Sequence, residues 1–130
     1  MVTRSAAALL CVLLGASALP AQQNTLGRSI FENKGNCYTC HGKNAGGTPL
    51  APNLQDDEWL NVDGSVEQIR QLVKSGVPRP KRYPGAMPAM GGAKLKDAEV
   101  DAVAIYVAGL RLATQTGAAA ATPAAGAGTE

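Results

Sequence analysis

The stretch Cys37-Tyr38-Thr39-Cys40-His41 decides how this chain is interpreted. Two cysteines separated by two residues, with a histidine directly after the second, form the C-x-x-C-H pattern that marks covalent haem attachment. At this spacing the two thiols can reach the two vinyl groups along one side of a porphyrin and form thioethers. His41 is then held beneath the iron as an axial ligand, and Gly42 lets the backbone pass close to the ring.

Three other interpretations of the cysteine pair remain open on the sequence alone. A redox disulfide of the thioredoxin type normally opens a helix in a βαβ unit, and no strand pattern is evident here. A structural zinc site needs four ligands, whereas His41 is the only histidine and only Cys37 and Cys40 lie outside the N-terminal segment. A plain structural disulfide leaves His41 without a role. Haem attachment uses all three residues.

The composition divides the 130 residues into a folding middle and two biased ends. Residues 1–21 combine Arg4, an apolar stretch over 6–19 and small residues before position 22, which is typical of a cleavable signal peptide. Residues 113–130 are almost entirely Ala, Gly, Thr and Pro, and we expect a disordered tail because no apolar face is available for burial. The folded domain is therefore expected over residues 22–112.

The N-terminal segment also predicts where the protein works. Its apolar stretch is too short for a comfortable membrane span, so we expect export to the periplasm with no stable membrane insertion after cleavage. Anchoring by an uncleaved signal is the minor alternative. The net charge of +2 is far from that of a nucleic-acid-binding domain, so no nucleic-acid partner is expected.

The folding middle is predicted to be all-α, with helices joined by long irregular segments. Apolar residues recur at helical spacing over 25–34, 66–75 and 97–110. Ser65 provides a cap for the second helix and Gly76 ends it. The whole chain has one Phe, one Trp and three Tyr, which is a thin core for one domain. Connections rich in Gly and Pro surround a space that a cofactor would fill.

Two methionines in a Pro- and Gly-rich loop are the candidates for a second axial ligand. The loop reads Pro84-Gly85-Ala86-Met87-Pro88-Ala89-Met90-Gly91, and a second imidazole within the chain is excluded because His41 is the only histidine. Pro88 biases Met87 towards an extended backbone, so the loop can present this thioether without helical constraint. We favour Met87, with Met90 as the alternative and an open or differently ligated iron as the third possibility.

These elements occur in the order found in class I c-type cytochromes, and residues 25–112 resemble that family of small monohaem electron carriers. The resemblance rests on Gly27, Phe31, the C-x-x-C-H motif, Pro52-Asn53-Leu54, the Met87 loop and Tyr106. It implies a small cytochrome c fold of three to four helices whose loops wrap around one covalently bound haem c. The stretch 51–60 is further similar to the cytochrome c domains of bacterial haem-copper oxidases.

The resemblance also implies specific contacts. The first and last helices should cross where Gly27 and Phe31 meet Tyr106, and the carbonyl of Pro52 should accept a hydrogen bond from His41. Weaker candidates for the haem environment are Trp59, Arg82 and Tyr83. Lys96 stands where the family usually has a capping Ser or Thr, so we expect the start of the last helix to fray.

The function implied is outer-sphere electron transfer, with iron cycling between ferrous and ferric and with no catalysis of its own. Expected partners are redox proteins, namely a donor dehydrogenase or reductase and an acceptor oxidase, and Lys43 with the edge near Cys40 is the candidate contact surface. One alternative is a fixed electron-transfer subunit of a dehydrogenase or terminal oxidase complex. Another is a haem enzyme or sensor with an open iron site.

Overall fold

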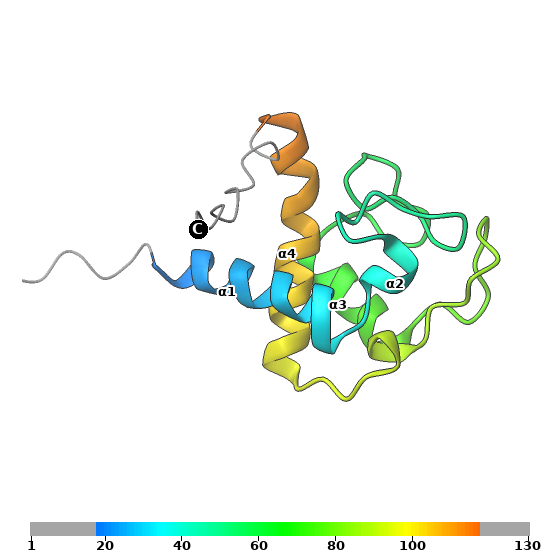
Figure 1. Ribbon diagram of the computed structural model, residues 1–130, viewed down its shortest axis with the longest axis horizontal. Coiled ribbons are helices and arrows are strands. Elements are labelled where there is room, and N and C mark those ends of the chain that lie inside the picture. The colour runs from blue at the N-terminus through cyan, green and yellow to red at the C-terminus, as the bar shows by residue number, and fades with distance from the viewer. Residues whose placement is uncertain (1–17, 118–130) are drawn as a thin grey trace, which may run out of the picture.

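The computed structural model describes residues 18–117, and these residues are helical with irregular connections (Figure 1). The α-helices are α1 (Ala18–Ser29), α2 (Tyr38–His41), α3 (Val66–Ser75) and α4 (Asp97–Gln115). A π-helical turn, η1 (Ile30–Lys34), continues α1, and a 3-10 turn, η2 (Ala89–Gly92), follows the methionine loop. Within this part of the chain the only strand-like pairings are two isolated bridges. The predicted all-α fold class is confirmed.

Gly27 determines how closely α1 crosses α4, the arrangement seen in Figure 1. A methyl group at this position would overlap the carbonyl oxygen of Ala102 and lie 2.6 Å from Cβ of Tyr106. One turn further on, the rings of Phe31 and Tyr106 meet edge to face, with centroids 5.6 Å apart and planes at 60°. This is a favoured geometry for aromatic pairs. The crossing implied by Gly27, Phe31 and Tyr106 is therefore confirmed.

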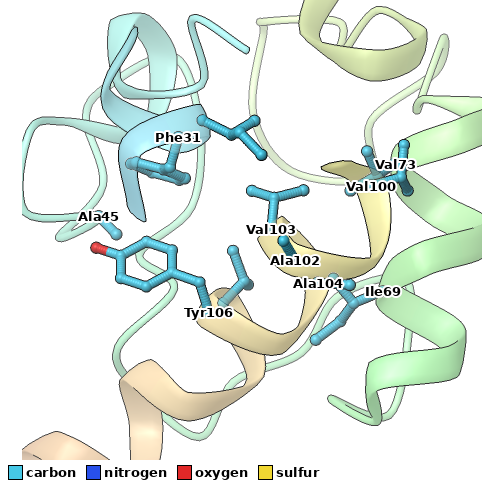
Figure 2. Packing of buried hydrophobic residues seen from close by; sticks show 11 residues of the cluster. Phe31, Ala45, Ile69, Val73, Val100, Ala102, Val103, Ala104 and Tyr106 are labelled. Carbon is cyan, nitrogen blue, oxygen red and sulfur yellow. The ribbon is translucent and has the colours of Figure 1, made fainter. Parts of the chain in front are cut away.

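The buried core lies where η1, α3 and α4 meet (Figure 2). Phe31, Val100 and Val103 are each 1% exposed, and the last two share one face of α4 because helical residues three and four apart are neighbours. The full set is Ile30, Phe31, Ala45, Ile69, Val73, Val100, Ala102, Val103, Ala104, Tyr106 and Val107. Several of these side chains also form the inner wall of the functional site.

Helix bounds agree with the sequence in the middle of the chain and differ towards its ends. α3 spans the predicted range, with Ser65 accepting a hydrogen bond from the backbone of Gln68. α1 begins at Ala18, inside the segment assigned to the signal peptide. α4 runs to Gln115, so residues 113–115 of the segment assigned to the tail are helical. The remainder of both end predictions, residues 1–17 and 118–130, lies outside the described residues.

Glu99 closes the start of α4 in place of the missing Ser or Thr. Its carboxylate accepts a hydrogen bond from the backbone N–H of Lys96 at 2.8 Å and pairs with Nζ of Lys34 at 2.7 Å. A carboxylate in the first turn also favours the positive end of the helix dipole. The expected fraying is therefore not observed. None of the helices within residues 18–117 combines the length and the apolar character needed to span a membrane.

Candidate functional site

A cleft separates the C-x-x-C-H segment from the apolar face of α3 and α4. The space between them, measured out to the open solvent at the mouth of the cleft, is about 920 Å³. A neighbouring hollow of about 530 Å³ shares Cys37, His41 and Met87 with the cleft and adds Cys40. The two hollows therefore share a wall and form one site. The inner wall is apolar and includes Phe31, Ile69, Leu72, Val73, Val103 and Val107.

The π turn η1 places the cysteine motif at the edge of this cleft. Gly35 ends the turn by donating its N–H to the carbonyl of Ile30 at 2.7 Å, and a methyl group at Gly35 would lie 2.9 Å from that oxygen. The short helix α2 follows, in which His41 donates its backbone N–H to the carbonyl of Cys37 at 3.0 Å. Residues four apart lie on the same helix face, so Cys37 and His41 face the site together.

His41 is held in the tautomer that a metal ligand requires. Its Nδ1 lies 3.0 Å from the carbonyl oxygen of Pro52, and because a carbonyl can only accept, Nδ1 carries the hydrogen. Burial lowers the pKa of His41, and the contact with Pro52 offsets only part of this shift. The ring is therefore neutral at pH 7, with the lone pair of Nε2 free to bind a metal. The hydrogen bond implied by the resemblance is confirmed.

The environment of Cys37 argues against a redox-active or zinc-binding motif. No disulfide joins Cys37 to Cys40, and burial raises the pKa of the Cys37 thiol to about 11. Redox-active C-x-x-C pairs depend instead on a cysteine with a lowered pKa. Among residues 18–117, no group of three His, Cys, Asp or Glu side chains is placed to hold a metal ion. A protonated, half-buried thiol is compatible with thioether formation.

The structure separates the two candidate methionines. Met87 lines both hollows together with His41, whereas Met90 is absent from the described lining of either. A pair of backbone hydrogen bonds with Val77, of 2.8 and 3.0 Å, fixes the segment around Met87. Met90 lies in η2 with a left-handed backbone, φ 54°. The geometry therefore favours Met87 over Met90 as the methionine that shares the site with His41.

The weaker candidates divide into two that line the cleft and one that does not. Trp59 and Tyr83 line it. Arg82 does not line it, and its guanidinium makes a two-pronged ion pair with Glu58, a residue of the cleft wall, with both distances 2.7 Å. Lys81 lines the cleft in its place and donates to the carbonyl of Leu60 at 2.8 Å. The sequence did not identify Lys81 and Glu58 as cleft residues, because the partner of each lies more than 20 positions away in the chain.

The residues present fit a haem. The indole N–H of Trp59 is buried without a hydrogen-bond partner among the described residues, and it belongs to a side chain of the cleft wall. A haem carries two carboxylates that can accept from such a donor. Two thiols, a neutral imidazole with one free nitrogen, and a thioether complete the donor set around an apolar space. This is the chemistry required for thioether attachment and His/Met ligation.

Comparison with known proteins gives a consistent result. The family model described as "Cytochrome C oxidase, cbb3-type, subunit III" matches residues 22–107. The cbb3-type cytochrome c oxidase subunit FixP of Bradyrhizobium sp. (strain ORS 278) is 45% identical over 87 residues, which are 65% of this chain and 29% of that protein. FixP of Bradyrhizobium diazoefficiens is 38% identical over 96 residues, 72% of this chain and 32% of that protein.

A third relative is the cbb3-type cytochrome c oxidase subunit CcoP of Rubrivivax gelatinosus. It is 35% identical over 95 residues, 73% of this chain and 28% of that protein. The chain thus spans about three tenths of the length of these curated relatives. No solved structure matches the chain significantly.

Proposed function

The chain belongs to the family of cbb3-type cytochrome c oxidase subunit III, and we propose that it serves as a one-haem electron-transfer domain of a terminal oxidase complex. It is a cytochrome c domain, which implies covalently bound haem c. The observation that carries the proposal is that His41, with Nδ1 committed to Pro52, lines the same apolar cleft as Met87.

The site residues take the following roles in this proposal. Cys37 and Cys40 would form the two thioether bonds, His41 would bind the iron through Nε2, and Met87 would bind it through its thioether. The bound haem supplies a one-electron centre that alternates between ferrous and ferric iron. The carbonyl of Pro52 fixes the plane of the His41 ring and keeps its proton on Nδ1.

The apolar wall of the cleft would raise the reduction potential of the bound haem. Excluding water disfavours the extra positive charge of ferric iron, so burial against α3 and α4 raises the potential. Soft thioether ligation by Met87 acts in the same direction. Because His41 and Met87 would both bind the iron, the domain would carry electrons and perform no reaction on a substrate.

The relatives support assignment to an oxidase complex over a freely diffusing carrier. Their printed names describe subunits of cbb3-type oxidases. Because this chain covers only about three tenths of their length, membership of such a complex is part of the proposal. Location in the periplasm is likewise proposed, on the signal-like composition of residues 1–21.

Absorption spectroscopy of the exported protein tests the haem assignment. A haemochrome spectrum should show covalent haem, and the ferric protein should show the far-red sulfur-to-iron charge-transfer band. Met87→Ala should abolish this band, while the matched variant Met90→Ala should keep it. A high-spin ferric spectrum in the unsubstituted protein, or loss of the band only in Met90→Ala, would contradict the proposed ligation.

Co-purification tests the place of the domain in a complex. The affinity-tagged chain, expressed in its native host and extracted in mild detergent, should bring down a haem-copper oxidase in constant proportion. Recovery of the haem-loaded chain alone would instead establish a free carrier.

A further inference from the structure

The segment 55–60, which carries Trp59, is irregular yet is held from two sides. It forms no helix or strand, and Glu58, Trp59 and Leu60 all line the cleft. The indole N–H of Trp59 is buried and has no partner within residues 18–117.

The first set of contacts comes from the loop before Met87. The guanidinium of Arg82 donates two hydrogen bonds of 2.7 Å to the carboxylate of Glu58, and Lys81 donates to the carbonyl of Leu60 at 2.8 Å. These contacts attach the residues on either side of Trp59 to a loop more than 20 positions away in sequence. A two-pronged arginine–carboxylate pair fixes orientation better than a single contact does.

The second set comes from the last turn of α4. The hydroxyl of Thr114 lies 2.9 Å from the carbonyl oxygen of Gln55 and 2.8 Å from that of Arg111 in its own helix, and Gln115 donates to the carboxylate of Asp57 at 3.0 Å. Nε of Arg111 lies 3.5 Å from the same carboxylate. This is the part of α4 that extends beyond the helix expected from the sequence.

We propose that these two sets of contacts act as clamps that hold segment 55–60 closed over the bound haem and thereby raise its potential. Arg82 and Thr114 are positioning residues: they act on the haem through Trp59 and through water exclusion. The inference rests on the proposed function, because it requires haem in the cleft. Exposed ion pairs contribute little to stability, so the effect of the clamps should appear in the site more than in the melting temperature.

The sign of the shift in haem potential distinguishes a positioning role from a direct electrostatic effect of the side-chain charge. Arg82→Gln removes a positive charge and Glu58→Gln removes a negative one, so direct electrostatics would shift the potential in opposite directions. Release of the clamp admits water to the cleft, which favours ferric iron and lowers the potential in both variants. Thr114→Val lowers it as well, with no change of charge.

The test uses haem-loaded, purified protein with two matched controls. Arg28→Gln breaks an exposed arginine–glutamate pair on α1, and Thr116→Val removes a hydroxyl that contacts only its own helix.

Midpoint potentials are measured by redox titration, and amide hydrogen exchange is followed over residues 55–60. We expect a lower potential and about fivefold faster exchange in the three clamp variants. The controls should match the unsubstituted protein. Combining Glu58→Arg with Arg82→Glu should restore both readouts.

Two results would overturn the inference while leaving the proposed function intact. One is covalent haem in every variant with potentials and exchange rates equal to those of the controls. The other is opposite shifts in Arg82→Gln and Glu58→Gln with no shift in Thr114→Val, which would reduce the effect to charge. Failure to find haem c in the unsubstituted protein would overturn the proposed function, and the inference with it.

Discussion

The indole of Trp59 rests against the backbone of Gly64, and this contact shows how single residues shape the cleft. Gly64 has a φ of 85°, and a methyl group there would lie 2.5 Å from Nε1 of Trp59. Glycine at this position therefore meets two requirements, a left-handed backbone and space for the indole ring. Gly64 thereby makes room for Trp59, the residue whose indole N–H has no hydrogen-bond partner among residues 18–117.

Replacing Gly64 with alanine should displace Trp59. We expect Gly64→Ala to lower the free energy of unfolding by about 1–3 kcal/mol, because it combines backbone strain with a ring overlap. Gly46→Ala is the matched control, since nothing lies within 4 Å of a methyl group built there. Denaturant titration followed by tryptophan emission measures both. Equal stabilities for the two variants would show that Gly64 does not confine the indole.

At the scale of secondary-structure elements, the crossing of α1 and α4 depends on backbone contact at Gly27. The N-terminal helix packs through this glycine and the Phe31–Tyr106 pair. Its continuation as a π turn then directs the chain towards the cysteines. Single π turns within helices are frequent at functional sites, because the extra residue re-aims the chain that follows.

Gly27→Ala should destabilise the crossing even though alanine is the better helix former. The new methyl group would overlap the carbonyl of Ala102, and we expect a loss of about 1–3 kcal/mol from overpacking. Gly109→Ala, on α4, would place its methyl group 3.8 Å from Asn24, an ordinary contact. That control should gain up to about 1 kcal/mol from helix propensity. Thermal unfolding of the haem-loaded variants compares them. Stabilisation by both substitutions would contradict the close approach.

Elements with local signals could be predicted from the sequence, whereas elements set by distant contacts could not. α3 has its cap at Ser65 and its stop at Gly76 within the sequence window that a pattern covers. The π turn depends on a hydrogen bond from Gly35 to Ile30, which no periodicity indicates. The last turn of α4 depends on Thr114 meeting the loop at Gln55, 59 residues earlier.

At the scale of the whole molecule, ion pairs join segments that are far apart in the chain. Lys34 pairs with Glu99 at 2.7 Å, and Lys74 pairs with Asp97 at 2.8 Å. Hydrogen bonding to Lys34 and to the backbone of Lys96 lowers the pKa of Glu99, and hydrogen bonding to Lys74 lowers that of Asp97. Both carboxylates are held in their charged form more strongly in the folded state than in the unfolded chain.

Acidification should therefore remove part of the stability of the domain. A folded-state pKa below the unfolded value gives a stabilisation that is present above the ordinary carboxylate pKa and is lost as the pH falls through the folded value. We expect Glu99→Gln to melt below the unsubstituted protein at pH 7, with the gap closing as the pH falls below the ordinary carboxylate pKa and through the lower folded value. Melting curves across this range test the expectation. A gap that stays constant with pH would show that Glu99 acts through packing.

The residues of the candidate site could be predicted from the sequence where a short local motif identifies them. The motif located Cys37 and His41, and the proline after Met87 distinguished it from Met90, a choice that the lining of the cleft favours. The pairing of Arg82 with Glu58, 24 positions earlier, could not be predicted from the sequence. Side-chain pairing across such distances is decided by the folded backbone, so composition and spacing do not contain it.

The crossing of the first and last helices also fixes an order of events during folding. Gly27 can meet Ala102 only after α4 has been synthesised, and closing so long a loop is slower than forming a local helix. Once the ends interlock, both cysteines are half-buried. The thiols of Cys37 and Cys40 are therefore more exposed before the two helices cross than after.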